Sequence, residues 1–523
     1  MLHGYKTEDY TLPRTGVAFQ TSDKRLQALY DRCEALCREN LKPYDDRVVL
    51  QEGSQYKGVW LETQPMGGEM YAKRNMEAAL NNILIFPHLQ RPDGRYPGMI
   101  RDEGRMGIGV HYCWLQGFYL GIPALRMAYH LGLDKRYMRL MYDSIQRFDQ
   151  YLWAYRDSNG DGLLESFCTW DTGEDHAQRF LAYGAQDGGF GGEKPPKGHG
   201  KLPYASMEMM GFSCQARLVL AEFARLLGSG EEAAWKRAAQ EVRDRVYAAL
   251  WDAGRGACFD RSCDGQPLPV LSHVNLRCMY HRLFSQEMAD EFIQRHLMNP
   301  EEFYTPVPLP STAANDPLYR SADSNNWSGP CQGLTYQRAA DALLHYGHYA
   351  EAALLGRKWL DLLIRTGRLV QQYDPFDGTP GQAEDGYGPT MLAALEYISL
   401  LYGINIRYGR VLFGGVQDGS AFSYTQQYGN RQFTLIGKGT EMTASADGRE
   451  LFTVQRGVSV ETDLQGRIRR VVGIDEKPVP CLLQTEDAAM RCVVAPNEQW
   501  AVHENKLVLQ TKIPFAKPTQ TNG

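Results

Sequence analysis

Apolar residues return at three- and four-residue intervals along most of the chain, from about Lys24 to Tyr402. Leu220, Phe223 and Leu227 are one example. This spacing is typical of amphipathic helices that bury one face. Gly-containing turns divide several such stretches into helical hairpins, as expected for helix ends. The pattern predicts about eleven helices, including pairs over residues 68–86, 113–155, 215–251 and 337–367 and a last helix over 388–403.

Long segments rich in Gly, Pro and aromatic residues separate the helical pairs. Loops of this length are usually functional or disordered. Here they carry most of the Trp, Asp and Glu residues of chemical interest. This rhythm favours a toroid of helical hairpins with a site built from loops at one end. The segments are residues 42–67, 87–112, 156–204, 299–329 and 367–387.

The period changes after Tyr402 to short β-branched runs bounded by Gly or Asp-Gly turns, such as Asp447-Gly448. We therefore predict a mainly α-helical domain over residues 1–404. A small β-sandwich-like domain follows over residues 405–523, and we expect it to be an accessory domain that shields the first.

Composition and charge narrow the function. The 523 residues carry a net charge of −6, and no Lys/Arg run stands out, which argues against a nucleic-acid partner. No apolar run reaches the roughly 18 residues that a membrane span needs. The N-terminus does not resemble a signal peptide, and the eleven cysteines are scattered, so we expect a cytoplasmic protein with reduced thiols.

One loop is rich in carboxylates. Around Trp170 it holds Asp171, Glu174 and Asp175. Hydrolysis of a glycosidic bond needs a protonated carboxylic acid at the leaving oxygen and usually a second carboxylate. An aromatic wall stacks on sugar and raises the pKa of the acid. Residue types alone are weak evidence for carbohydrate chemistry, because acidic loops are usually solvated. Asp175 as a helix N-cap and the tryptophans as core residues are further structural alternatives.

The order of these residues adds a resemblance. The segment WDTGEDHAQRF, residues 170–180, is similar to the general-acid motif of inverting (α/α)6-barrel glycoside hydrolases. These are the family 37 trehalases and family 63, with its mannosylglycerate-hydrolase-like and α-glucosidase members. The resemblance implies an (α/α)6 barrel, and it implies that Asp175 is the general acid and Arg179 a sugar-site residue.

Three further segments resemble the same families in the same order and extend the likeness over roughly residues 50–400. MEMMGFSCQARLVLAEFARLLG places Glu208 where an Asp is usual, and NNWSGPCQGLTY retains Trp327. VQQYDPFDG resembles the segment that carries the family's base, just before Tyr373. The resemblance implies a substrate-binding set of Trp60, Glu62, Gln64, Trp170, Asp171, Arg179, Glu208, Trp327, Gln371 and Tyr373.

Two departures matter. The family's catalytic base is a Glu at the position of Gln371, and an amide cannot take a proton from water. The nearest candidate base is Glu384, with a surface carboxylate as its structural alternative. Asp374, Asp377 and Asp385 are further candidates. Trehalases also show W-D-S-Y-F where this chain has W-L-E-T-Q over residues 60–64, which argues for a different sugar contact, although Glu62 is still able to bind sugar hydroxyls.

A possible metal loop lies in the same region. Asp157, Asn159 and Asp161 open like a calcium loop, but position twelve is Cys168 rather than Glu. We expect a tight Asx turn there, with a structural Ca²⁺ as the alternative. No cofactor is required for the expected chemistry.

Together these features predict an exo-acting, inverting glycoside hydrolase of carbohydrate metabolism. We expect its substrate to be a short α-glycoside, either a glucoside or a mannoside. We expect it to bind neither nucleic acid nor a membrane, and the sequence does not determine whether it forms homo-oligomers. Asp175 is the acid, and a carboxylate near Glu384 is the base. The alternatives are a glycoside phosphorylase, which needs no protein base, and a non-catalytic sugar-binding protein whose base has been lost.

Overall fold

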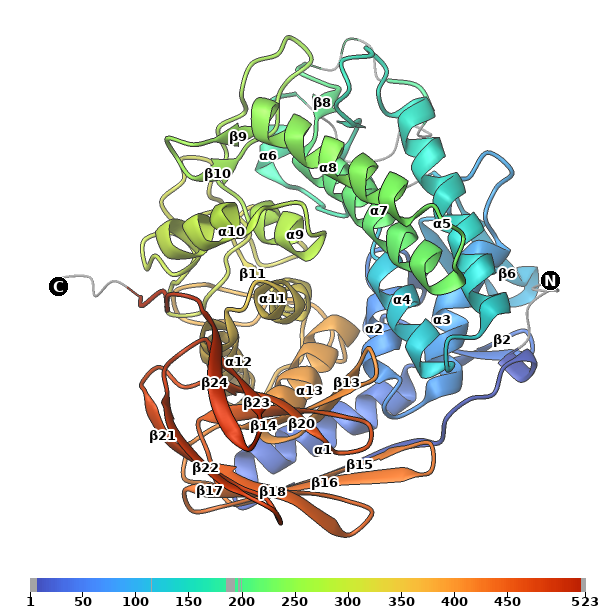
Figure 1. The fold of residues 1–523 in the computed structure, drawn as a ribbon. Coiled ribbons are helices and arrows are strands. Elements are labelled where there is room, and N and C mark those ends of the chain that lie inside the picture. The colour runs from blue at the N-terminus through green and yellow to red at the C-terminus, as the bar shows by residue number, and fades with distance from the viewer. Residues whose placement is uncertain (1–6, 114, 185–192, 196–197, 199, 519–523) are drawn as a thin grey trace.

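The helical part of the molecule is built around a closed ring of six helices. In the computed structural model, which describes residues 7–113, 115–184, 193–195, 198 and 200–518, each ring helix contacts the next and the last contacts the first (Figure 1). In order around the ring they are α2 (Gln64–Tyr71), α4 (Gly121–His130), α7 (Met207–Leu227), α9 (Val274–Tyr280), α11 (Gly333–His345) and α13 (Gly388–Tyr402).

A second set of helices lies outside the ring, and burial separates the two sets. Every residue of the inner helix α13 is buried. The outer helix α8 buries only Ala239, Val242 and Val246. A helix that is buried on all sides reads as apolar all round, whereas an outer helix shows a single apolar stripe. The outer helices are α1 (Lys24–Glu39), α3 (Met76–His88), α5 (Lys135–Tyr155), α8 (Glu232–Ala249), α10 (Gln286–Phe292) and α12 (Tyr349–Thr366).

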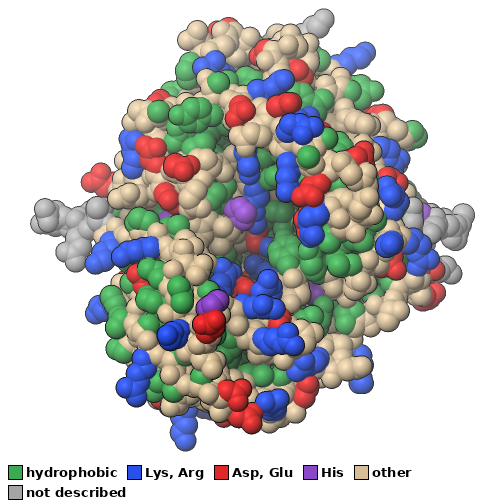
Figure 2. All heavy atoms as spheres, in the orientation of Figure 1, with side chains coloured by type: hydrophobic (Ala, Val, Ile, Leu, Met, Phe, Trp, Pro, Cys, Tyr) green, Lys and Arg blue, Asp and Glu red, His purple; other side chains and the backbone are tan. Residues whose placement is uncertain are grey.

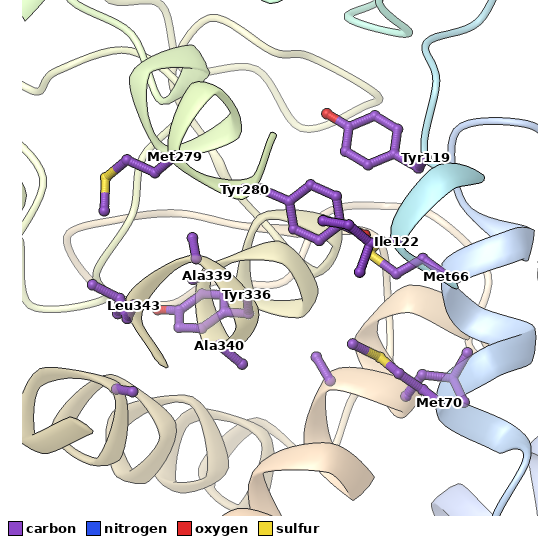
Figure 3. Close-up of a cluster of buried hydrophobic side chains, with 14 of the residues drawn as sticks. Met66, Met70, Tyr119, Ile122, Met279, Tyr280, Tyr336, Ala339, Ala340 and Leu343 are labelled. Atoms are coloured by element: carbon purple, nitrogen blue, oxygen red, sulfur yellow. The ribbon is translucent and has the colours of Figure 1, made fainter. Parts of the chain in front are cut away.

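The interior of the ring is filled by side chains rather than by a channel. Met66, Tyr119, Ile122 and Tyr280 converge there from α2, α4 and α9 and from the segment before α4 (Figure 3). Tyr336 joins them from α11 (Figure 3). This apolar layer separates the two ends of the ring from each other.

The predicted hairpin turns are confirmed. Gly228 ends α7 with a φ of 66°, in the left-handed region where glycine has no Cβ penalty. Gly347 lies between α11 and α12 with a φ of 80°. The predicted pairs over residues 215–251 and 337–367 correspond to α7 with α8 and α11 with α12.

The C-terminal part is a two-sheet β domain, as the sequence pattern indicates. One sheet has six strands in the order β13 (Ile404–Arg407), β14 (Arg410–Gly415), β19 (Val458–Asp463), β20 (Ile468–Gly473), β23 (Glu498–His503) and β24 (Lys506–Lys512). The other has seven strands in the order β1 (Thr15–Thr21), β15 (Phe422–Tyr428), β16 (Arg431–Lys438), β17 (Glu441–Ala446), β18 (Arg449–Gln455), β21 (Val479–Gln484) and β22 (Ala489–Val494).

Strand β1 is a correction to the predicted division of the chain. It lies in the range 1–404 assigned to the helical domain, yet it pairs antiparallel with β15, with Phe19 opposite Tyr424. Phe19 is buried and its ring packs 5.1 Å from that of Tyr30 on α1. The strand thus fastens the β domain to the outer helix α1.

No helix within the described ranges is long and apolar enough to span a membrane. The eleven cysteines are free thiols, and eight of them are buried.

The packing of β1 is testable by Phe19→Ala. Removal of a buried ring from this junction is expected to lower the free energy of unfolding by about 3–5 kcal/mol. Val508→Ala, on the exposed side of β24, is the control and should change it by about 0.5 kcal/mol or less. Chemical denaturation measures both, and equal effects would contradict the packing role of β1.

Candidate active site

A cavity of about 230 Å³ lies at one end of the ring, among the loops that precede α2, α4, α11 and α13. The loop that contains Asp175 closes it on a further side. The lining residues are Glu52, Tyr56, Trp60, Glu62, Gln116, Trp170, Gly173, Asp175, His176, Asn325, Trp327, Gln371 and Tyr387.

The structure brings six of the residues singled out from the sequence into this one cavity. They are Trp60, Glu62, Trp170, Asp175, Trp327 and Gln371. The other six do not line it: Gln64, Asp171, Arg179, Glu208, Tyr373 and Glu384. Five of those six are buried and make contacts behind the cavity wall, whereas Glu384 is exposed.

Arg179 and Glu208 form ion pairs below the cavity rather than sugar contacts. The Arg179 guanidinium donates to Glu174 and to Asp260, and all three side chains are buried. Glu208 accepts a hydrogen bond of 3.1 Å from Arg277 and one of 2.8 Å from the Tyr119 hydroxyl. The buried arginines therefore hold carboxylates in place from underneath, which fixes the loop before Asp175.

Glu174, next to Asp175, is the residue most tightly held. It accepts hydrogen bonds from Arg179 and from the Thr172 hydroxyl, and its Oε1 lies 3.2 Å from Nε2 of His273. Burial alone would raise the pKa of Glu174, but Arg179 and Arg277 hold that pKa well below its usual range. Glu174 is therefore a fixed anion that turns its neighbour toward the cavity.

The remaining predicted contacts also serve the wall. Arg156 donates to both carboxylate oxygens of Asp171, at 2.6 and 2.9 Å. The Gln64 amide donates to the Leu50 carbonyl, and the Tyr373 hydroxyl donates to the Arg368 carbonyl at 2.7 Å. The bidentate pair between Arg156 and Asp171 is strong and directional. These residues shape the cavity without facing it.

Glu62 faces the cavity from the loop between β4 (Val59–Trp60) and α2. Its carboxylate accepts a hydrogen bond of 2.9 Å from the Gln116 amide and one of 3.1 Å from the Arg338 guanidinium. A Cβ at Gly173 would lie only 1.9 Å from its carboxylate, so glycine is required there. Burial raises the pKa of Glu62 to about 7 despite the arginines.

Glu52 is a further carboxylate in the same cavity, and no motif or spacing in the sequence indicates it. Its carboxylate accepts a hydrogen bond of 3.1 Å from the Thr63 hydroxyl and is also hydrogen-bonded to Tyr387. Burial and the charges of Glu62 and Asp175 raise the pKa of Glu52 to about 8. Glu52 and Asp175 are thus close enough for their charges to interact.

Asp175 ends a chain of hydrogen bonds that includes the altered base position. The Asn325 amide donates to Asp175 at 2.5 Å, the Gln371 amide donates to Asn325 at 2.7 Å, and the Tyr56 hydroxyl donates to Gln371 at 2.7 Å. Because an amide carries both a donor and an acceptor, the same chain accommodates Asp175 with or without its proton.

Aromatic rings form the walls of the cavity. Trp60 and Trp170 are half-buried. Trp327 is fixed, because the His273 ring stacks 5.3 Å from it and the Arg277 guanidinium lies 4.9 Å from its ring. Flat apolar faces beside hydrogen-bonding side chains suit a sugar ring, which has apolar faces and polar edges.

Glu384 is a correction. Its side chain is exposed and does not line the cavity, and only its backbone carbonyl is used, accepting 2.7 Å from the Ser54 hydroxyl. Among the described residues, the nearest candidates to replace the base are Glu52 and Glu62. Asp374 and Asp377 accept hydrogen bonds within their own turn, and Asp385 pairs with Arg32 and Arg368 outside the cavity.

The Asp157–Asp161 loop makes the Asx-type hydrogen bonds expected of it. Backbone N–H groups of Gly162, Asp161 and Leu163 donate to Asp157, Asn159 and Asp161 respectively. Among the residues that the structure describes, no group of three or more His, Cys, Asp or Glu side chains is arranged to hold a metal ion.

Backbone conformation marks two lining residues that the sequence analysis missed. Gln116 and His176 have φ values of 57° and 58°, which non-glycine residues adopt rarely. The backbone N–H of Gln116 donates a hydrogen bond of 3.0 Å to the carbonyl of Trp170, so the loop that contains Asp175 fixes the conformation of Gln116. Such conformations cluster at functional sites, but no composition or spacing signal reveals them.

Comparisons with known proteins find a matching family and similar folds. Residues 115–388, just over half of the chain, match the family of mannosylglycerate hydrolase MGH1-like glycoside hydrolase domains. No curated protein matches the chain in sequence.

Solved structures share the fold at low sequence identity. The family 63 mannosylglycerate hydrolase from Thermus thermophilus, solved in complex with glucose, aligns with a TM-score of 0.57 and 18% identity over 71% of this chain and 99% of its own. A sialidase aligns with a TM-score of 0.63 and 14% identity, over 86% of this chain and 42% of its own. A family 78 rhamnosidase from a Bacillus species aligns with a TM-score of 0.54 and 13% identity, over 83% and 41%.

The buried ion pairs below the cavity are testable by Arg277→Met. Removing Arg277 takes away the cation closest to the buried Glu208, so the free energy of unfolding should fall by about 3–5 kcal/mol. Arg225→Met breaks the exposed Arg225–Glu222 pair of α7 and should cost about 1 kcal/mol or less. Calorimetry or chemical denaturation compares the two, and equal losses would contradict the account.

Proposed function

The chain belongs to the mannosylglycerate hydrolase-like family of glycoside hydrolases, and we propose that it is an exo-acting, inverting member that releases one uncharged sugar from a short α-glycoside, a glucoside or a mannoside. The ring of six helices is, in this proposal, the (α/α)6 barrel of the resembling families. The observation that carries it is that Asp175 and Glu52 line one small cavity with aromatic walls.

Asp175 is proposed as the general acid and Glu52 as the general base. Inverting enzymes place a water between the base and the anomeric carbon, with the two carboxyl groups on opposite sides of the sugar. Glu52 lies on the side of Gln371, because Tyr387 hydrogen-bonds Glu52 while packing 5.8 Å from the ring of Tyr56, which hydrogen-bonds Gln371. The base has thus moved to a neighbouring loop of the same wall.

Gln371 has a positioning role in this proposal. Through Asn325 it fixes the direction in which the Asp175 carboxyl points. In the cleavage step, the Asp175 proton passes to the leaving oxygen, the glycosidic C–O bond breaks, and water forms the new C–O bond while Glu52 takes its proton. The product is the sugar with inverted anomeric configuration and the free alcohol.

The size and charge of the cavity support an exo-acting enzyme for neutral sugars. At about 230 Å³ it is below the roughly 300–1,000 Å³ of typical small-molecule sites, which suits a single terminal sugar ring. It contains three carboxylates, and no Lys or Arg side chain lines it in the described part of the chain. A cavity lined by carboxyl groups and without a cation in its described lining disfavours phosphate as nucleophile and anionic substrates.

The roles of the carboxylates are testable by substitution. Asp175→Asn should lower kcat by about two to four orders of magnitude for natural glycosides, whose leaving groups need the proton, and much less for nitrophenyl glycosides. Glu52→Gln should abolish hydrolysis of both substrate types. Glu384→Gln is the matched control and should retain wild-type rates. If Glu384→Gln is inactive while Glu52→Gln is active, the proposed base is wrong.

The pH profile follows from the shared proton. The reactive form carries the one proton of the pair on Asp175 and has Glu52 ionised; because the pKa of Glu52 is raised, this form is the minor one, and interacting sites titrate as a pair. Because the pKa of Glu52 is raised to about 8, the last proton leaves near that pH, and no acid remains above it. Thus kcat/KM should fall as pH rises through about 8. A plot that still rises between pH 8 and 9 would contradict this protonation state.

A further inference from the structure

A second cavity, of about 410 Å³, lies at the opposite end of the ring, between the helices and the β domain. One wall is apolar and comes from helices α4, α7 and α13 and strand β14, with Ile122, Leu125, Val219, Leu400 and Leu412. The tip of the β13–β14 hairpin, with Tyr408, lies against it. Figure 2 shows a hollow near the middle of the molecule with Lys and Arg side chains along it.

The wall is also strongly basic, and some of its arginines come from the same elements, α4 and β14. Five arginines line the cavity against two carboxylates, Asp341 and Glu461. Asp341 is shared by three of the arginines, and Glu461 by the other two. The five are Arg126, Arg282, Arg407, Arg410 and Arg470.

Ion pairs behind this wall do not remove the excess of positive charge. Glu69 pairs with Arg126, whereas Glu396 is shared between Arg407 and Lys73. With these groups counted, two positive charges remain. The carboxyl ends of α11 and α13 face the cavity, and each contributes about half a negative charge, so the site stays cationic.

Unsatisfied polar atoms in the wall are of both kinds. Among the described residues, the Nε of Arg126 and the amide nitrogen of Asn405 lack an acceptor, and the amide oxygen of Gln215 lacks a donor. Because these atoms are buried, it is the net positive charge of the lining that favours an anion in the cavity. The environment also opposes any further cation: burial, then Arg282, lowers the pKa of His345 to about 3.

We propose that this cavity binds a small organic anion, with its phosphate or carboxylate group on the arginine wall and an apolar body against the leucine and valine side chains. Arginine is suited to such groups because its planar fork matches them. The site is separate from the sugar cavity, because the two cavities share no lining residue. The proposal does not depend on the glycosidase assignment.

The test uses phenyl phosphate as a probe on the full-length protein at constant ionic strength. Isothermal titration should show one binding site, and Arg470→Gln should weaken that binding about tenfold or more, the loss expected for a charge-assisted hydrogen bond. Arg449→Gln, which removes an exposed arginine elsewhere in the same domain, is the matched control and should bind like the wild type.

Additional probes identify the chemical group that is bound, and a second variant distinguishes loss of the site from misfolding of Arg470→Gln. Inorganic phosphate and benzoate separate the anionic group from the apolar body, and phenol should not bind. Leu412→Trp fills the apolar wall while keeping every arginine, so it should also abolish binding of phenyl phosphate. The proposal is overturned if no anion binds the wild type, or if Arg470→Gln and Leu412→Trp both bind phenyl phosphate as the wild type does.

Discussion

A layer of buried arginine–carboxylate pairs across the ring holds in place the loops that line the cavity. Arg179, Arg277 and Arg338 hold Glu62, Glu174 and Glu208 where the loops meet the helices. Burying these charges is costly unless each is paired and hydrogen-bonded. The pairs leave the loops little freedom, because a shifted loop would strand a charge in the interior. The position of Asp175 therefore follows from its neighbour Glu174.

The same constraint shapes the chemistry of the cavity. Arginines lie beneath the lining but not in it, so Glu174 stays ionised while Glu52, beyond their reach, keeps a raised pKa. Glu174 therefore serves as a fixed anion, whereas in the proposed mechanism the exchangeable proton of the cavity is shared by Glu52 and Asp175. The ring thus has a negative cavity at one end and a positive one at the other, with an apolar layer between them.

Much of the fold could be predicted from the chain. Apolar spacing and glycines such as Gly228 identify the helical hairpins, because they are local signals. Strand β1 could not be placed, because its partner β15 lies some 400 residues away and nothing in a seven-residue segment names it. Its Phe19 finds a core made by helix and sheet together.

The site divides in the same way. Trp170, Trp327 and Asp175 belong to motifs, and the sequence therefore predicts them as site residues. The motif does not distinguish a residue that lines the cavity from Arg179, which lies below the cavity and pairs with Glu174. Glu52 belongs to no motif. It became a candidate only when the fold placed it beside Asp175, and Glu384 lost that role because its side chain points into solvent.

The central claim is that Glu52 activates the water opposite Asp175, and the products of Glu52→Gln in sodium azide test it most directly. An anion that replaces the base-activated water should restore turnover of a nitrophenyl α-glycoside and give the β-glycosyl azide, identified by NMR. Formation of no glycosyl azide, or of the α-anomer, would contradict the account.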